Sequence, residues 1–490
     1  MLHGLALSLV IGTTTLFAQG IPDRPEKLTF PSLEFQVPKS KDFKAELKNG
    51  IPVFLAPDPK GPPMARLTVI WRGGAYLEPK GKEGLASFFG SQLVLGGTSK
   101  LSPEQLEDKL EGMAASLSSN CGNTSGTISL QVLDKDLPDG LELLTQALLD
   151  PAFAPERLEI AKRSARQAME RRNDSVTSIV PYQMNYLLFG ANHFAANERT
   201  AASQEAVTPG DLKAFHAKLL HPSNFVIHAS GNFERKALLE LLNKGLGSMK
   251  AAKDLKPVEK VPAPNFTRQP GIYVSNKVAP QSMVQWAFPG IRRTDADWHA
   301  GAVMNHILGG SFTSRLMKKI RSDEGLTYGV RTALGEGAHW RGDLTGGLQT
   351  QNRTVAYALR LALTEMQRLK EQPLTEAELT VVKNGLIEAF PAQWSGKQAI
   401  MARMAEEQLL GWPKDWWVDY RQKVQAVTPA DVQRLAKKLL DFDKLVVFAA
   451  GTAAEIEAGD PDHPGALKDV CPLPLVRLPL RDPLTLQPQK

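Results

Sequence analysis

The sequence predicts an α+β protein of two homologous α/β-sandwich domains, each an antiparallel-rich sheet covered by helices. Three observations support this fold class. A long motif recurs in the two halves, strands and helices do not alternate strictly enough for a parallel doubly wound sheet, and a Lys- and Pro-rich segment separates the halves. With 490 residues, 42% of them apolar, the chain is long enough to bury a core in each half.

The recurring motif ends each half of the chain. The stretch VTPGDLKAFHAKLLHPSNFVIHASGNF, from position 207, matches VTPADVQRLAKKLLDFDKLVVFAAGTA, from position 427, at 10 of 27 positions without a gap. Each copy predicts a helix with Thr208 or Thr428 as its N-cap and proline next, then an apolar strand that ends at Gly231 or Gly451. A weaker match upstream pairs QLVLGGTSKL with NHILGGSFTSRL. We therefore expect two copies of one domain.

Within the first copy, the hydrophobic pattern separates strands from helices. It predicts strands at ARLTVIWRGGAY and GTISLQVLD, and helices at 102–115, 137–149 and 155–172. The last of these begins with acidic residues and ends with basic ones, which is the order that the helix dipole favours.

Composition places the domain boundaries. We expect an N-terminal domain at 35–249 and a C-terminal domain at 272–455. Residues 250–271 are rich in Lys and Pro without periodicity, which indicates an extended linker. The tail at 456–490 contains too many prolines for a helix or a central strand, so we expect it to wrap over a domain surface or to be partly disordered.

The N-terminus resembles an export signal. An uncharged run from Leu5 to Phe17 is followed by Ala18, where a signal peptidase could cut, and it is shorter than the about 20 residues that a membrane span needs. The interpretation is a signal peptide at 1–18 and a periplasmic or secreted mature protein without stable membrane insertion. The alternative is a cytoplasmic protein with an apolar N-terminus.

If the protein is exported, the mature chain should begin near Gln19. N-terminal sequencing of the protein from its native source checks this expectation. Recovery of the initiator methionine, or of Leu2, would instead favour the cytoplasmic alternative.

Charge and cysteine content exclude some classes of function. The net charge of +6 comes from scattered Lys and Arg residues with no basic run or aromatic stripe, which argues against nucleic-acid binding. The two cysteines, Cys121 and Cys471, have no metal-binding spacing, and they are either one disulfide or two free thiols.

The stretch EGLASFFGSQLVLGGTSKL, at 83–101, predicts a buried helix ended by glycine. Such a helix, early in a long α/β chain, could carry a metal site on one face. It contains no His, Cys or carboxylate between Gly84 and Thr98.

Together, these paired domains resemble the insulinase-like (pitrilysin) zinc metallopeptidases, with GLA before the first long helix and a VTP-helix-strand ending in each half. The resemblance is to the bacterial short-chain branch and the mitochondrial processing peptidase subunits, and it covers about 35–453. It implies that each chain is one half of a clamshell. In active members the first helix carries His-x-x-Glu-His, and a Glu farther along the chain completes the zinc site.

This sequence departs from that motif at every position. Ser87 and Ser91 stand at the two histidines, Gly90 stands at the general base, and Gln167 falls where the distal Glu is expected. Zinc needs three protein ligands and a carboxylate that takes a proton from bound water. We therefore expect this chain to bind no metal.

The second half keeps a feature that the resemblance assigns to catalysis. The stretch SFTSRLMKKIRSDEGLTYGV matches the family's C-terminal-domain signature, and by position its functional residues are Arg321 and Tyr328. The resemblance implies that they bind the substrate backbone and stabilise the oxyanion, as a guanidinium and a phenol can. The structural alternative is that Arg321 pairs with a helix carboxylate and Tyr328 merely precedes a strand.

The resulting hypothesis is a non-catalytic subunit of a heterodimeric zinc endopeptidase. A homologous partner would carry His-x-x-Glu-His and the zinc, and unfolded peptides would add a strand to a sheet edge. Two alternatives remain open at this point, namely an inert scaffold and a peptide-binding protein of the cell envelope.

Overall fold

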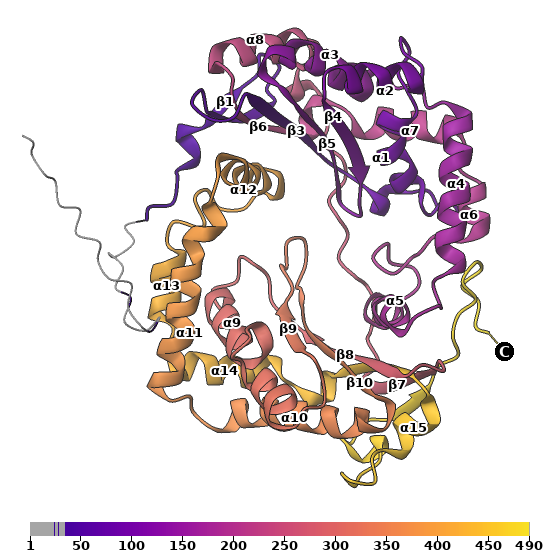
Figure 1. The fold of residues 1–490 in the computed structure, drawn as a ribbon, viewed down its shortest axis with the longest axis vertical. Coiled ribbons are helices and arrows are strands. Elements are labelled where there is room, and N and C mark those ends of the chain that lie inside the picture. The colour runs from indigo at the N-terminus through magenta and orange to yellow at the C-terminus, as the bar shows by residue number, and fades with distance from the viewer. Residues whose placement is uncertain (1–23, 25–27, 29–34, 490) are drawn as a thin grey trace, which may run out of the picture. The chain divides into compact units, whose positions relative to one another are not determined.

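Two six-stranded sheets organise the part of the chain that the structure describes, one in each half (Figure 1). The structure is a computed structural model that describes residues 24, 28 and 35–489. The chain from Val37 onward forms one compact unit, which contains both sheets. The expected signal peptide at 1–18 lies outside the described residues.

The first sheet has the strand order β1-β2-β6-β3-β5-β4, and only β2 and β6 pair in parallel. Its strands are β1 Lys44–Glu46, β2 Pro52–Pro57, β3 Met64–Arg72, β4 Ser116–Cys121, β5 Ser125–Leu133 and β6 Phe225–Gly231. Side chains of β3 and β5 are fully buried at every second position, as expected of a sheet with one face on the core. The strands expected from ARLTVIWRGGAY and GTISLQVLD are therefore confirmed.

The second sheet repeats this order as β12-β7-β11-β8-β10-β9. Its strands are β7 Gly271–Asn276, β8 Gln281–Pro289, β9 Val330–Leu334, β10 Asp343–Gln351, β11 Val446–Gly451 and β12 Leu475–Arg477. Five positions correspond in order and direction to those of the first sheet. The sixth differs, because β1 pairs antiparallel with β2, whereas β12, from the tail, pairs parallel with β7. The predicted fold class of two antiparallel-rich α/β domains is confirmed.

Helices cover the sheets in both halves. Those of the N-terminal half are α1 Leu85–Leu95, α2 Pro103–Gly112, α3 Leu137–Leu149, α4 Pro155–Glu170, α6 Ala201–Glu205, α7 Pro209–Leu219 and α8 Arg235–Lys244. Those of the C-terminal half are α9 Trp298–Asn305, α10 Val355–Glu371, α11 Glu376–Ala389, α13 Tyr420–Ala426, α14 Pro429–Leu439 and α15 Ala453–Ala458. Thr208 and Thr428 cap α7 and α14 in matching capping boxes, as the repeat predicts.

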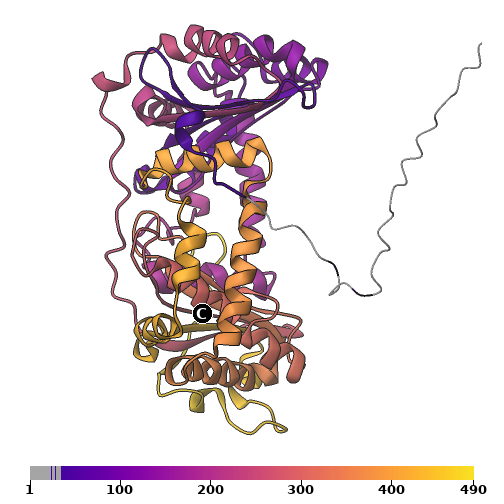
Figure 2. The ribbon, with the colours of Figure 1, turned by 90° about the vertical axis from the view of Figure 1, so that its left-hand side faces the viewer.

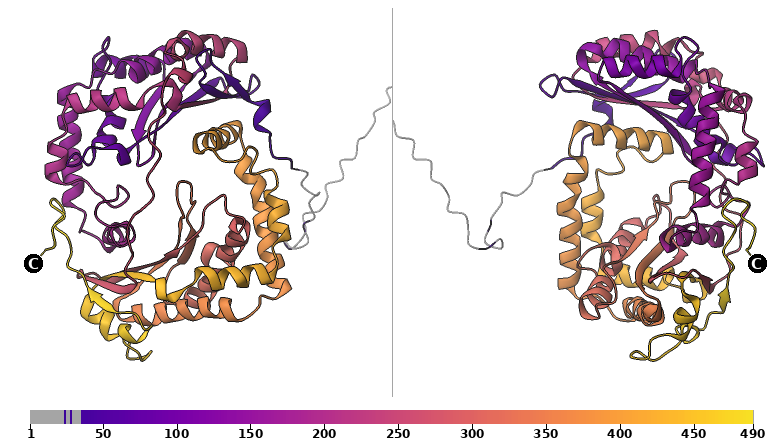
Figure 3. Two further views of the ribbon diagram at one scale, coloured as in Figure 1. Left: turned by 180° about the vertical axis from the view of Figure 1, so that it is seen from behind. Right: turned by 45° about the vertical axis from the view of Figure 1, so that its right-hand side comes forward.

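In addition, one helix from each half of the chain packs on the sheet of the other half. Helix α5 Val176–Phe189 packs on β8 and β11 of the second sheet, and α12 Lys397–Leu410 packs on β2, β3 and β6 of the first. Ile179 thereby joins the core around Phe448, and Met401 joins the core around Phe54. The same exchange is visible from other sides (Figure 2 and Figure 3). Chain position alone had placed α5 with the N-terminal domain.

The linker and the tail run along the surface. The linker contains only a short 3₁₀ turn at Ala252–Asp254 before β7 begins at Gly271, and Figure 2 shows it as an extended trace. The tail supplies the edge strand β12 and then returns to the N-terminal half, where the guanidinium of Arg172 donates to the carbonyl of Pro483 at 2.9 Å.

Two further features bear on the expectations from the sequence. Cys121 and Cys471 are both free thiols. Among the described residues, no helix is both long enough and apolar enough to cross a membrane.

Candidate functional site: a degenerate metal helix and an exposed Arg–Tyr pair

Helix α1, which carries the degenerate motif, is fixed by an aromatic cluster. The Phe89 side chain is fully buried, and its ring meets those of Trp71 and Phe215 edge-on at centroid distances of 6.1 and 5.4 Å. Edge-to-face pairs of this kind stabilise a core by about 0.5–1.5 kcal/mol each beyond burial. The helix is therefore held in place by aromatic packing.

Gly90, at the position of the family's general base, lies directly against the edge strand β4. A Cβ atom built on Gly90 would lie 2.1 Å from the backbone nitrogen of Cys121 and 2.5 Å from the carbonyl carbon of Asn120. The hydroxyl of Ser119 donates to the carbonyl of Gly90 at 2.6 Å, which holds helix and strand together. No side chain, and hence no glutamate, fits at this position without moving the backbone.

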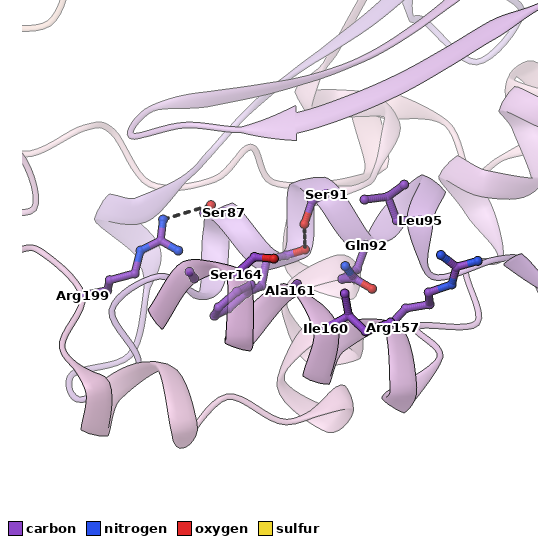
Figure 4. A pocket seen from close by; sticks show the side chains of 11 residues that line it. Ser87, Ser91, Gln92, Leu95, Arg157, Ile160, Ala161, Ser164 and Arg199 are labelled. Atoms are coloured by element: carbon purple, nitrogen blue, oxygen red, sulfur yellow. Dashed lines mark hydrogen bonds between the residues drawn. The ribbon is translucent and has the colours of Figure 1, made fainter. Parts of the chain in front are cut away.

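Ser87 and Ser91, at the positions of the two histidines, line a cavity of about 350 Å³ between α1 and α4 (Figure 4). The hydroxyl of Ser91 donates to the carbonyl of Phe88 at 3.0 Å, whereas Ser87 accepts from the guanidinium of Arg199 at 3.2 Å. Helix α4 presents Ser164 and Ala165 to this cavity, and Gln167 is not among the residues that line it.

The donor set of this cavity does not fit zinc. Zinc in proteins is bound by thiolates, imidazoles and carboxylates, and none of these groups occurs among the described residues that line the cavity. Two guanidinium groups, of Arg157 and Arg199, lie there instead, and their charge opposes a bound cation. Across the described part of the chain, no three His, Cys, Asp or Glu side chains are grouped to hold a metal ion.

A buried carboxyl group supports the start of α1. Glu78 accepts hydrogen bonds from the backbone N–H groups of Gly84 and Ala86, at 3.2 and 2.7 Å, and so replaces a side-chain cap on the helix. Burial raises the pKa of Glu78 to about 7, although these hydrogen bonds oppose the shift. Its position at a helix N-terminus accounts for its presence without a catalytic role.

Arg321 and Tyr328 are brought together in the second domain. The guanidinium carbon of Arg321 lies 5.8 Å from the ring centroid of Tyr328 and 4.8 Å from that of Phe312. Tyr328 is 94% exposed and Phe312 is 70% exposed, so both rings face solvent. Arg321 belongs to the π-helix Met317–Asp323, a rare geometry that is frequent at functional sites.

The structure argues against the alternative in which Arg321 pairs with a helix carboxylate. Among the described residues, no carboxylate pairs with its guanidinium, whereas the neighbouring Arg315 and Lys319 are bound to Glu378 and Glu324. The arginine with no ion pair is thus the one that the signature singles out. Tyr328 does precede a strand, β9, but its ring lies beside Arg321 and outside the core.

Arg199 and Phe312 are site residues that the sequence did not point to. Arg199 reaches Ser87 across 112 residues of sequence, and nothing near it in the chain signals that contact. Phe312 lies inside the signature SFTSRL, so its position was available, but its contact with Arg321 depends on the turn between α9 and the π-helix.

Comparison with known families agrees with this interpretation of the site. Residues 55–197 match the insulinase family (peptidase family M16), and residues 206–386 match the peptidase M16 inactive domain. The two matches meet near the motif that begins at position 207.

The individual relatives include one that is named a non-peptidase homolog. The chain is 28% identical over 334 residues to the non-peptidase homolog YmxG of Helicobacter pylori, covering 67% of this chain and 75% of that protein. It is 23% identical over 260 residues to subunit 1 of the bovine mitochondrial cytochrome b-c1 complex, covering 50% and 52%. A crystal structure of a peptidase M16 inactive domain from Pseudomonas fluorescens has the same fold, with a TM-score of 0.74, 24% identity and coverage of 83% and 97%.

Proposed function

Because this chain belongs to the insulinase family (peptidase family M16) as a non-catalytic member, we propose that it is one subunit of a heterodimeric zinc endopeptidase. A homologous partner carries His-x-x-Glu-His and the zinc. This chain contributes Arg321 and Tyr328, which bind the backbone of an unfolded peptide and stabilise negative charge on its carbonyl oxygen.

The observation that carries this proposal is the contrast between the two domains. In the first, the position of the general base is closed by the contact between Gly90 and β4. In the second, the half-buried Arg321 lies beside the exposed ring of Tyr328, without a carboxylate partner among the described residues. An arginine in contact with two exposed aromatic rings is also the composition of an interaction hot spot. The composition of the cluster formed by Arg321, Tyr328 and Phe312 therefore favours a protein that still binds a substrate or a partner there.

The relatives support assembly with other chains. The bovine relative is by name a subunit of a larger complex. We also propose that the mature protein acts outside the cytoplasm, in the periplasm or after secretion, because the N-terminal sequence has the pattern of a signal peptide.

Affinity purification of the tagged chain from its native source tests the partnership. We expect a co-purifying homologue that contains His-x-x-Glu-His, with zinc in about equal amount to that partner. Recovery within a large complex that contains no such homologue would overturn the proposal in favour of a scaffold. Recovery of the chain alone with bound peptides would overturn it in favour of a peptide-binding protein.

A further inference from the structure

The cavity between α1 and α4 is lined by cationic and hydroxyl groups. It is lined by the guanidinium groups of Arg157 and Arg199 and by the hydroxyls of Ser87, Ser91 and Ser164, and none of the described residues that line it is acidic. A volume of about 350 Å³ lies within the range of small-ligand sites. Its chemistry suits an anion, whereas the family's metal helix suits a cation.

Arg199 is the cationic residue of this cavity that makes no ion pair among the described residues. Its guanidinium is half-buried, donates to Ser87 at 3.2 Å and lies 5.5 Å from the ring centroid of Phe88. Within the described residues its guanidinium makes no ion pair, and the adjacent Glu198 lies 3.6 Å from Arg172 instead. Burial lowers the pKa of Arg199, and the negative charges of Glu198 and Glu78 oppose this shift.

Arg157, at the other end of the cavity, is already neutralised. Its guanidinium lies 2.9 Å from the carboxylate of Glu104 and 3.4 Å from that of Glu107. Any anion that enters the cavity therefore finds its open donors at Arg199. The hydroxyl of Ser87 accepts from Arg199, so its own hydrogen is free to donate to the same anion.

The end of the cavity that holds the ion-paired Arg157 also carries two apolar side chains. Leu95 from α1 and Ile160 from α4 line the cavity and are 48% and 47% exposed, so both offer apolar surface to a ligand there. Figure 4 shows Arg199 and Ser87 at one end and these two side chains at the other. A ligand that fits both ends carries an anionic group beside an apolar one.

We propose that this cavity binds the C-terminal carboxylate of a peptide whose last residue is apolar. The carboxylate pairs with Arg199 and accepts from Ser87, because a guanidinium matches the geometry of a carboxylate. The terminal side chain packs on Leu95 and Ile160. This site belongs to the chain itself, so the inference does not depend on a zinc-bearing partner.

The test uses the purified mature chain and a fluorescently labelled six-residue peptide that ends in Leu. Fluorescence anisotropy is measured for the peptide as the free acid, as the C-terminal amide, and as the amide with an internal Glu. We expect the free acid to bind at least about tenfold more tightly than either amide, as expected of a hydrogen-bonded charge pair. Equal binding of the three peptides, or no binding of the free acid, would refute the site. Preference for the amide with Glu would instead assign it to a side-chain carboxylate.

Substitutions locate the binding to this cavity. Arg199→Ala should reduce the affinity for the free acid at least about tenfold and leave the amides unchanged, and Ser87→Ala should reduce it less. Ser87→Ala removes only a surface hydroxyl, so it keeps the test valid if Arg199→Ala does not fold. Arg163, exposed on α4 outside the cavity, provides the matched control Arg163→Ala, which should bind as the wild type does. Unchanged affinity in both Arg199→Ala and Ser87→Ala would contradict the proposal.

Discussion

Arg321→Ala or Tyr328→Phe should slow peptide turnover by the assembled enzyme about 10²- to 10³-fold, the usual cost of removing one preorganised oxyanion donor. The two side chains act mainly on charge that appears in the transition state, so peptide affinity should fall much less than turnover. Because the ring of Tyr328 faces solvent and Arg321 makes no ion pair in the described structure, replacing either side chain should not unfold the chain. Steady-state kinetics of the purified complex, with assembly checked by size-exclusion chromatography, measure both effects.

Arg292→Ala is the matched control for this experiment. Arg292 is an exposed arginine of the same domain that belongs neither to the Arg321–Tyr328 pair nor to the cavity at α1, and turnover should not change when it is replaced. Unchanged turnover in both Arg321→Ala and Tyr328→Phe would reduce the pair to surface residues and favour the scaffold alternative. Loss of assembly in these variants would instead show that the cluster serves only as an interface.

Gly90→Ala should destabilise the chain, although alanine is the better helix former. The added Cβ would meet the backbone of β4 at 2.1 Å, and backbone atoms cannot rotate away as a side chain can. Overpacking of this kind costs about 1–3 kcal/mol, against a gain of about 1 kcal/mol in helix propensity. We expect a net loss of about 1 kcal/mol, and at most about 2 kcal/mol, in the free energy of unfolding, measured by urea denaturation.

Gly112→Ala is the matched control, and we expect it to cause no loss of stability in the same assay. Gly112 is the last residue of α2, and apart from its chain neighbours and its own helix no described residue comes within 4 Å of the position that its Cβ would take, so alanine there should not destabilise the chain. Equal stability of the two variants would show that α1 can move away from β4. The triple replacement Ser87→His, Gly90→Glu and Ser91→His should be less stable still, and it should not restore activity.

The repeat and its caps made most of each domain predictable. Helix α3 begins and ends where the pattern placed it, at Leu137 and Leu149, because its apolar stripe is uninterrupted. Thr208 and Thr428 fixed the starts of α7 and α14 through local side-chain bonds that are recognisable from a few adjacent residues. The exchange of α5 and α12 was not predictable, because an amphipathic pattern shows that a helix has an apolar face and not which sheet that face meets.

The residues of the candidate site, too, were predictable where a local motif marks them and unpredictable where contacts join distant segments. Position within motifs singled out Ser87, Gly90, Ser91, Arg321 and Tyr328, and the structure adds the contacts that each of them makes. The sequence could not show that Gly90 touches the backbone of β4 or that Arg199 reaches Ser87, because both contacts join segments far apart in the chain. Gln167 does not line the cavity, whereas Ser164 and Ala165, three and two residues earlier on α4, do.

The zinc content of the purified chain, by elemental analysis after exposure to equimolar zinc and desalting, tests the central claim most directly. The cavity at α1 offers hydroxyls and guanidinium groups where the family has imidazoles and a carboxylate. We therefore predict far less than one zinc ion per chain and no chelator-sensitive cleavage of peptides by the chain alone. Near-equimolar zinc together with chelator-sensitive cleavage would contradict the assignment of this chain as a non-catalytic subunit.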